Sequence, residues 1–387
     1  MALGNIKDQV SIVGMGCTKF GENWDMSADD MIVEAAYEAF EDAGMDPGDI
    51  QAAWVSVTSS GASGTTLANP LKLDGIPITR VENYCASGQE AIRNAAFSIA
   101  CGMYDRVLAL GFEKLKDSGL RGLPNINFAD PVIGQGNSPP GVFSLPWVDF
   151  FERYGVTKET LAKISVKNHY HGSMNPKAHL QKAVSLEQVM KAPIISYPLG
   201  LFDCCPTTDG ASAAILVSSK IAKNFRKDYI SIKGLSVAVD SGIPGYRPRH
   251  EFSSWPATVK AAKEVYRQSG ITNPRKEVDL IELHDCFSIT ELVTYCDLGL
   301  CEKEEVKDCV DGGVFGLKGD MPVNVSGGLK SFGHPVGATG IRMVYELYKQ
   351  MQGKVGGERQ VKNAKLGLAH NLGGYAQVAA VMVVGLE

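Results

Sequence analysis

The sequence predicts an α/β fold in which a largely parallel sheet is covered by helices on both faces. Two observations support this prediction: apolar strand candidates alternate with amphipathic helix candidates, and the alternation occurs twice, on either side of a looser middle. The chain has 387 residues, enough for two domains or for one large domain with two lobes. The pattern therefore indicates two similar halves, although they share little residue identity.

The first half begins with a buried strand candidate, Val10–Gly16, that ends in glycines. A helix then starts after Ser27, where Asp30 gives an acidic variant of the capping box, and it ends at Gly44 as a left-handed residue. The remaining elements are strands near residues 53–58, 78–82, 106–111 and 208–217 and a helix over residues 87–101.

Residues 116–201 differ from both halves because they contain many Gly, Pro and Asn residues, together with a helical segment around 156–170. A connection of this length is usually functional, so we predict an inserted loop domain over the face of the catalytic site. The predicted division is an N-terminal half of residues 1–115 plus 202–225, the inserted domain at 116–201, and a C-terminal half at 226–387.

The second half repeats the order of the first. A strand at 278–283 leads into the segment His284-Asp285-Cys286-Phe287, which we call the His284 segment. The other predicted elements are strands at 230–239, 323–326, 366–369 and 376–384 and helices at 257–269 and 338–351. One strand–turn–helix unit in each half therefore has a counterpart in the other.

Two of these turns present reactive side chains. The Cys85 turn (Asn83–Ser87) lies where a strand ends and a helix begins, and there free N–H groups and the helix dipole favour the nucleophilic thiolate. The His334 turn (Gly327–Gly340) is rich in glycine and presents a histidine before another helix. It lacks the Lys-Ser/Thr ending of a phosphate-binding loop. A nucleophile and a base on matching turns indicate covalent acyl transfer.

Composition limits the classes of function. There are 38 Lys and Arg residues against 43 Asp and Glu residues, and the net charge of −5 gives no reason to expect nucleic acid as a partner. No apolar run approaches the ~20 residues of a membrane helix, and the N-terminus has no signal-peptide pattern. Nine cysteines without a Cys-x-x-Cys pair indicate reduced thiols in a cytoplasm, with no metal site.

Four segments in order resemble the thiolase superfamily over nearly the whole chain. They are the Cys85 turn, the His284 segment, Gly333-His334-Pro335 and Asn371-Leu372-Gly373-Gly374. The resemblance is strongest to the sterol-carrier-protein-type thiolases and their archaeal and bacterial acetyl-CoA acetyltransferase relatives. It implies the thiolase fold, with two βαβαβαββ halves in a five-layered αβαβα sandwich and an insertion that serves CoA and acyl binding.

The resemblance also implies a role for each matching residue. Cys85 is similar to the nucleophile that takes the acyl group, and His334 is similar to the histidine that accepts its proton. His284 takes the place of an asparagine in the commoner pattern and is expected to help bind the thioester oxygen. The backbone N–H groups of Cys85 and Gly373 are expected to form a second oxyanion hole.

Cys286 is expected to be the acid and base at the α-carbon of the substrate. Conventional thiolases place their second cysteine in a C-terminal turn, where this chain has Asn371, a residue that cannot exchange protons. The structural alternatives are that Cys286 is a small buried hydrophobe and that His284 joins a local network with Asp285. The other reactive side chains are expected to have structural roles. We expect Cys204 and Cys205 to pack within a loop, and His169 and His171 to bind no metal.

The reaction that the resemblance implies is CoA-dependent thiolytic cleavage of a 3-ketoacyl-CoA, or the reverse Claisen condensation, through an S-acyl-Cys85 intermediate. The substrate is either acetoacetyl-CoA or a bulkier aromatic β-ketoacyl-CoA such as benzoylsuccinyl-CoA. Phe143 and Trp147, near the run Gly134–Leu145, suggest the bulkier group, or else pack the loop onto the core. The alternatives are a ketoacyl-synthase-type condensing enzyme, although its His-Gly-Thr-Gly-Thr-like segment is missing, and a non-catalytic scaffold or lipid carrier.

No cofactor is expected apart from coenzyme A as a substrate. Relatives of this type suggest a homodimer or tetramer. They also suggest a small protein with a zinc ribbon and an OB-fold that forms a hetero-complex and completes the CoA site.

Overall fold

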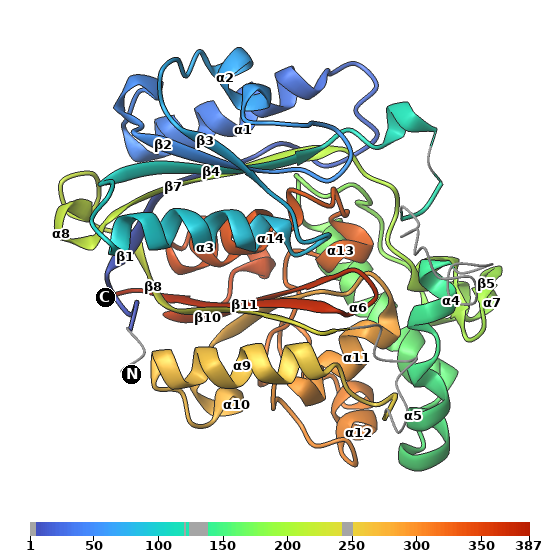
Figure 1. Ribbon diagram of the computed structural model, residues 1–387. Coiled ribbons are helices and arrows are strands. Elements are labelled where there is room, and N and C mark those ends of the chain that lie inside the picture. The colour runs from blue at the N-terminus through green and yellow to red at the C-terminus, as the bar shows by residue number, and fades with distance from the viewer. Residues whose placement is uncertain (1–4, 120, 124–137, 242–250) are drawn as a thin grey trace.

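The computed structural model describes residues 5–119, 121–123, 138–241 and 251–387. Its elements stack in five layers, helix–sheet–helix–sheet–helix, from the top to the bottom of Figure 1. This arrangement confirms the predicted α/β class and the layered sandwich that the resemblance implies.

The upper layer of strands belongs to the first half, in the order β3–β2–β4–β7–β1. β2 runs parallel to β3 and β4, whereas β7 runs antiparallel to β4 and β1, so the sheet is mixed rather than parallel throughout. The strands are β1 (Val10–Cys17), β2 (Ala52–Ser56), β3 (Ile78–Val81), β4 (Arg106–Glu113) and β7 (Gly210–Ser218).

The lower layer of strands comes from the second half, in the order β8–β11–β10–β9. β10 runs parallel to β9, and β11 runs antiparallel to β8 and β10. The strands are β8 (Ile230–Val239), β9 (Leu280–Leu283), β10 (Leu366–Gly373) and β11 (Val378–Gly385). Each therefore has a counterpart in the upper layer, and the two layers join where β1 meets β8 through Ser11–Ser231 and Ile12–Ile230.

The strand predicted at 323–326 is not a strand. Val323 forms a single bridge with Ile281, and the pairing stops there because Asn324 is left-handed, with φ of +53°. The Asn324 side chain takes over instead, since its Oδ1 accepts a hydrogen bond from the N–H of Leu283 at 2.9 Å. The chain can thus turn at once toward His334.

Helices form the outer and middle layers of Figure 1. α1 begins after Ser27 with the expected capping box to Asp30 and ends at Gly44, whose φ of +66° confirms the left-handed stop. The outer helices are α1 (Ala28–Ala43) and α2 (Thr65–Leu71) above, and α9 (Pro256–Ser269), α10 (Pro274–Glu277), α11 (Ser288–Asp297) and α12 (Val306–Asp311) below. The middle layer holds α3 (Ser87–Ala100) and α14 (Thr339–Met351).

Between β4 and β7 the chain forms several short elements beside the two sheets. The helical segment expected at 156–170 is α6 (Lys158–Ser173), whose N-terminus is capped by the Thr157 side chain. The other elements are α4 (Pro139–Phe143), α5 (Pro146–Tyr154), α7 (Leu186–Lys191), β5 (Ile194–Ser196) and β6 (Leu199–Gly200). Residues 134–137 of the glycine- and proline-rich run lie outside the described residues. The division into three domains stays a prediction.

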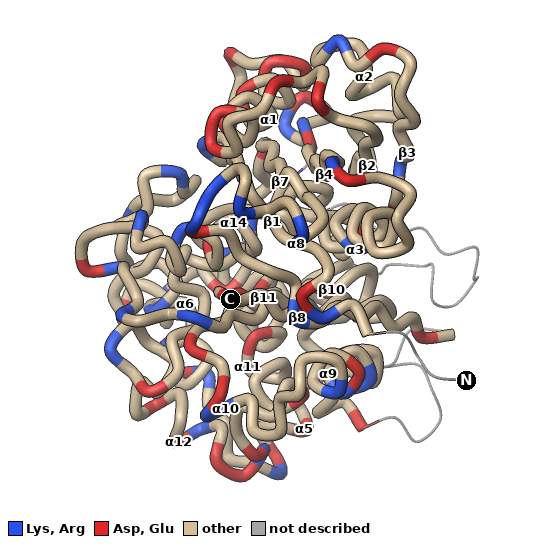
Figure 2. The backbone as a smooth tube through the Cα atoms, turned by 90° about the vertical axis from the view of Figure 1, so that its left-hand side faces the viewer, with Lys and Arg blue, Asp and Glu red and all other residues tan. Residues whose placement is uncertain are grey.

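Basic and acidic residues are scattered among uncharged residues along the described backbone, as Figure 2 shows. In the parts of the chain that the structure describes, no helix combines the length and the apolar character needed to cross a membrane.

Candidate active site

The Cys85 turn is tightly held between β3 and α3. Tyr84, the residue before the cysteine, is left-handed with φ of +53°. Ser87 stabilises this conformation because its hydroxyl accepts from the N–H of Asn83 at 2.8 Å and donates to the carbonyl of Tyr84 at 2.5 Å. Gly373 of β10 packs on the turn, where a Cβ would collide with the Asn83 carbonyl oxygen.

Cys85 is half-buried, and its surroundings disfavour the thiolate. Burial raises the pKa of the thiol to about 12, and the nearby carboxylates of Glu113 and Glu82 add to this effect. The raised pKa contradicts the expectation that the helix N-terminus favours the thiolate. Removal of the proton requires a base at the moment of attack.

His334 is fully buried and is held in one tautomer. Its Nδ1 lies 2.7 Å from Thr339 Oγ1, and the Thr339 hydroxyl donates its only hydrogen to the Pro335 carbonyl at 2.8 Å. Thr339 must then accept from Nδ1–H, which leaves Nε2 without a proton. Nε2 has no hydrogen-bond partner among the described residues. Burial, and then Arg342, lowers the His334 pKa to about 3, so the ring is neutral.

His284 meets His334 edge to face, with the ring centroids 5.1 Å apart. The amide nitrogen of Asn371 lies 2.9 Å from His284 Nδ1, an arrangement in which Nδ1 accepts and Nε2 carries the proton. Burial and the neighbouring His334 hold the pKa of His284 well below its usual value. The two histidines therefore differ in what they offer: His334 has an unprotonated ring nitrogen, and His284 has a ring N–H group.

Cys286 follows in the same segment and is buried, with 1% of its surface exposed. Its Sγ lies 3.7 Å from the hydroxyl of Thr290, one turn along α11. Burial raises the pKa of Cys286 well above its usual value, and a charge on Cys85 would raise it further. Cys286 is therefore a neutral thiol close enough to Cys85 for a charge on one sulfur to affect the pKa of the other.

Glycines let the Cys85 turn and the His334 turn approach each other. A Cβ on Gly88, at the start of α3, would lie 2.8 Å from the backbone nitrogen of Gly340, at the start of α14. The N-terminal ends of the two middle-layer helices therefore touch. The predicted residues Cys85, His284, Cys286, His334 and Gly373 come together at this point from four separate segments.

The sequence interpretation missed two residues that orient the histidines, Thr339 and Asn371. Asn371 was considered only as a residue that cannot exchange protons, whereas its amide selects the His284 tautomer. Thr339 lies five residues after His334, and the first turn of α14 brings its hydroxyl under the ring. A polar residue five positions after the histidine, in the first turn of the helix that follows, is the sequence signal that could have identified Thr339.

Two of the other reactive residues make contacts with the backbone of neighbouring segments. The N–H of Cys205 donates to the carbonyl of Cys286 at 2.9 Å, so Cys205 supports the His284 segment from behind. His171 Nδ1 lies 2.9 Å from the Asn324 carbonyl. Within the described residues, no group of three or more His, Cys, Asp or Glu residues has the arrangement of a metal site.

Phe143 packs the 138–145 loop onto the core, as one of the two interpretations expected. Its ring lies 5.3 Å from that of Phe287, 5.9 Å from Trp255 and 6.3 Å from Tyr375, and 3% of its surface is exposed. Trp147 is also buried and stacks on Phe151 at 5.3 Å.

A cavity of about 840 Å³ opens beside the His284 segment. Phe287 and Cys205 form part of its wall, and both adjoin Cys286, by sequence and by a backbone hydrogen bond respectively. Ile195, Leu201 and Phe202 add apolar surface, and Arg121 supplies a positive charge. The cavity is therefore large, mainly apolar and adjacent to the convergence of the four segments.

Comparison with known proteins yields matches along nearly the whole chain. Residues 10–124 match the family described as thiolase, N-terminal domain, and residues 247–386 match the family described as thiolase C-terminal domain-like. The acetyl-CoA acetyltransferase of Methanothermobacter thermautotrophicus is 38% identical over 97% of this chain and 98% of that protein. Human sterol carrier protein 2 is 35% identical over 97% of this chain and 72% of that protein.

Solved structures show a similar fold at lower identity. The structure of the Ltp2-ChsH2(DUF35) aldolase superposes with a TM-score of 0.87 at 23% identity and covers 99% of both chains. The acetyl-CoA acetyltransferase of Syntrophomonas wolfei superposes with a TM-score of 0.74 at 20% identity, over 98% of this chain and 100% of that one.

Proposed function

Because the chain belongs to the thiolase family and is an acyltransferase of that family, we propose that it cleaves a 3-ketoacyl-CoA through an S-acyl-Cys85 intermediate. The observation that supports this most directly is the pair of histidines with opposite tautomers beside two thiols. In the thiolase direction acetoacetyl-CoA gives two molecules of acetyl-CoA, and benzoylsuccinyl-CoA gives benzoyl-CoA and succinyl-CoA. The reverse Claisen condensation uses the same groups.

The first step forms the acyl-enzyme. Cys85 Sγ attacks the 3-keto carbon while the bare Nε2 of His334 takes the thiol proton. The bond between the α- and β-carbons then breaks, and its electron pair forms the enolate of the departing acyl-CoA, which is acetyl-CoA or succinyl-CoA according to the substrate. The Cys85 thiol has a pKa of about 12 and the His334 imidazole has a pKa of about 3, so the two side chains form no thiolate–imidazolium ion pair before the substrate reacts. Proton transfer therefore accompanies the attack.

Two sets of donors stabilise the negative charges that develop. His284 Nε2–H faces the thioester oxygen of the enolate, and the N–H groups of Cys85 and Gly373 receive the oxygen of the tetrahedral intermediate. Cys286 then gives its proton to the α-carbon, which releases the first acyl-CoA product. Its raised pKa keeps it protonated at rest, as the cleavage direction requires. Incoming CoA gives its thiol proton to Cys286 and takes the acyl group from Cys85, and the Cys85 sulfur recovers its proton from His334.

The substrate is a 3-ketoacyl-CoA whose acyl group is either small, as in acetoacetyl-CoA, or bulky and aromatic, as in benzoylsuccinyl-CoA. The cavity of about 840 Å³ beside Phe287 supports the bulkier class, because an acetoacetyl group would fill only a small part of it. Its apolar wall suits an aryl group, and Arg121 suits a carboxylate.

We also propose a homodimer or tetramer in the cytoplasm, and a small partner protein with a zinc ribbon and an OB-fold. The similar Ltp2-ChsH2(DUF35) aldolase supports the partner, because its name joins Ltp2 to ChsH2(DUF35). Co-purification of this chain with a co-expressed protein of that class tests the proposal. A chain that stays alone and is fully active contradicts it.

The function is tested by CoA-dependent loss of acetoacetyl-CoA and of benzoylsuccinyl-CoA, with and without the partner protein. Cys85→Ala and Cys286→Ala are expected to abolish cleavage. Cys101→Ala is the matched control, because Cys101 is exposed at the far end of α3. Cleavage that survives loss of Cys85, or no cleavage of either substrate by folded enzyme, contradicts the proposal and favours a scaffold or another condensing reaction.

A further inference from the structure

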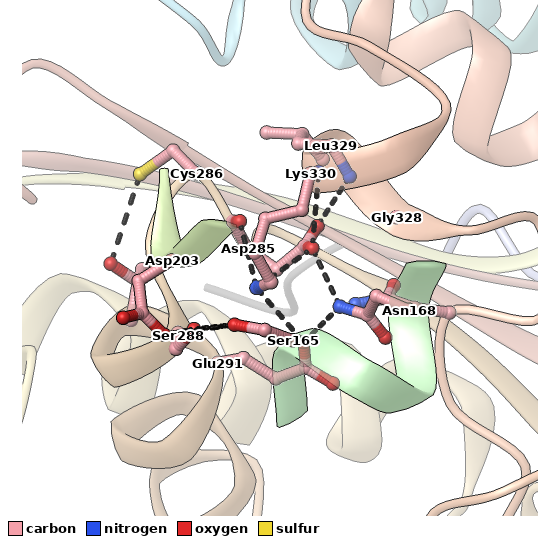
Figure 3. A network of polar contacts seen from close by, with 12 residues as sticks. Ser165, Asn168, Asp203, Asp285, Cys286, Ser288, Glu291, Gly328, Leu329 and Lys330 are labelled. Carbon is pink, nitrogen blue, oxygen red and sulfur yellow. Dashed lines mark hydrogen bonds and ion pairs between the residues drawn. The ribbon is translucent and has the colours of Figure 1, made fainter. Parts of the chain in front are cut away.

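A cluster of charged side chains lies directly behind the His284 segment. The side chains of Asp285, Glu291 and Lys330 have 0% exposure, and Lys330 Nζ lies 3.1 Å from Asp285 Oδ2 and 3.6 Å from Glu291 Oε2. Lys167 Nζ lies 2.9 Å from Glu291 Oε1 at the outer side. Figure 3 shows this cluster filling the space between α6, α11 and α13 (Gly328–Ser331).

Asp285 joins two catalytic segments. It stands between His284 and Cys286 in the chain, yet its carboxylate binds the His334 turn: Oδ1 accepts from the N–H of Leu329 at 2.5 Å and Oδ2 from that of Lys330 at 3.3 Å. The Lys330 ammonium also donates to the backbone carbonyl of Asp285 at 3.2 Å. Both the side chain and the main chain of Asp285 are therefore fixed by the other segment.

The approach of the two segments is close enough to require glycine. A Cβ on Gly328 would lie 2.6 Å from Asp285 Oδ1, and Gly328 is left-handed with φ of +61°. A third segment closes the cluster, because the amide nitrogen of Asn168 on α6 donates to Asp285 at 2.7 Å and to Glu291 at 2.6 Å. Three segments that are distant in sequence thus meet at one carboxylate.

Lys330 stays charged in the folded protein. Burial opposes the charge on Lys330, but the carboxylates of Asp285 and Glu291 outweigh it and raise the Lys330 pKa. A buried ion pair rarely stabilises a fold more than apolar side chains of the same shape would. Stability alone is therefore a weak reason for these charges, whereas fixed geometry beside a catalytic site is a stronger one.

We propose that the Asp285–Lys330 ion pair is a positioning element that fixes the His284 segment against the His334 turn. It rests on the proposed function, which assigns catalysis to those two segments. The pair touches no reacting atom. It holds the edge-to-face contact of His284 and His334, and it keeps the Cys286 thiol at its place on the same segment.

The test compares wild type with Lys330→Met, Lys330→Arg and the double variant Asp285→Asn/Lys330→Met. We expect Lys330→Met to lower the kcat of thiolysis about 100-fold with an unchanged KM for CoA, as a misplacement near 1 Å does. Lys330→Arg, which keeps the charge, is expected to recover part of the loss. The double variant is expected to lose no more than the worse single variant, because the two residues act as one unit.

Arg226→Met is the matched control. Arg226 also forms largely buried ion pairs, with Asp42 at 3.1 Å and Asp228 at 2.7 Å, but it contacts neither catalytic segment. We expect wild-type kcat per folded Arg226→Met enzyme. A folded Lys330→Met enzyme with wild-type kcat overturns the proposal. If that variant does not fold, Lys330→Gln, which keeps a donor of hydrogen bonds, decides by the same criterion.

A second readout needs no turnover. In protein labelled with ¹⁵N-histidine, the imidazole signals of His284 and His334 are expected to move in Lys330→Met and to stay in Arg226→Met. If wild-type enzyme cleaves no ketoacyl-CoA, the proposed function is contradicted. The histidine signals still test whether the ion pair positions the two rings. Unmoved signals contradict the positioning role.

Discussion

At the scale of single residues, the neighbours of each histidine decide what it can do. Thr339 donates its hydrogen to Pro335 and can only accept from His334, so it leaves Nε2 free as a base. Asn371 acts on His284 in the opposite sense and leaves an N–H. Two similar rings 5.1 Å apart therefore obtain different roles from one hydrogen bond each.

Replacement of Thr339 by valine is expected to release the His334 tautomer. The variant leaves a buried Nδ1–H without an acceptor, a loss of about 1–3 kcal/mol, and kcat is expected to fall about 10- to 100-fold. Thr339→Ser keeps the hydroxyl and is expected to retain most activity. Steady-state kinetics on folded enzyme measures both, and equal loss in the two variants would refute the tautomer argument.

The protonation of Cys85 predicts a pH dependence. Since burial raises its pKa to about 12, the thiolate is rare at neutral pH and its fraction grows about tenfold per pH unit. The rate of Cys85 alkylation by iodoacetamide in empty Cys286→Ala enzyme is expected to rise continuously between about pH 6 and pH 10. Peptide mass spectrometry gives the rate, and a plateau near neutral pH would show instead that the helix N-terminus activates the thiolate.

At the scale of elements, the site depends on how closely α3 and α14 meet. Each helix begins at a catalytic turn, and their first residues touch backbone to backbone at Gly88 and Gly340. From the sequence, the glycines of the His334 turn are explained by the shape of that turn alone. Their more important function is to allow contact between two segments.

Gly88→Ala tests this contact. The added Cβ would lie 2.8 Å from the Gly340 nitrogen, and backbone atoms on both sides cannot yield easily. We expect a loss of about 1–3 kcal/mol in the free energy of unfolding, from overpacking. Gly48→Ala is the control, because nothing lies within 4 Å of its Cβ position. Urea denaturation measures both, and equal stability of the two variants would contradict the close approach.

At the scale of the whole molecule, the two halves share their middle layer. α14 belongs to the second half, yet it contacts β7 and β1 of the first half as well as β9 and β10 of the second. Most of its residues are buried, since it has a sheet on each side. Neither half can bury its inner helix without the other.

This sharing predicts cooperative unfolding. Trp54 reports on the first half and Trp255 on the second, so single-tryptophan variants that keep one or the other follow the halves separately. We expect their urea transitions, recorded by fluorescence, to coincide with each other and with circular dichroism. Transitions at different urea concentrations would show that the halves unfold independently.

The sequence by itself determined the class of the fold, the order of most of its elements and the two turns that carry Cys85 and His334. Local signals suffice for these, because the Ser27–Asp30 box, the Gly44 stop and the strand-to-helix turns at Cys85 and His334 act within a few residues of chain. The resemblance of four segments to the thiolase superfamily identified the family.

Only the tertiary structure decided the state of the site. Burial is a property of all the layers together, and it reverses the expected activation of Cys85. The tautomer of His284 depends on Asn371, 87 residues away, and the Asp285–Lys330 pair spans 45 residues. Such contacts leave no periodic signal in the sequence, because they arise where two folded segments happen to meet.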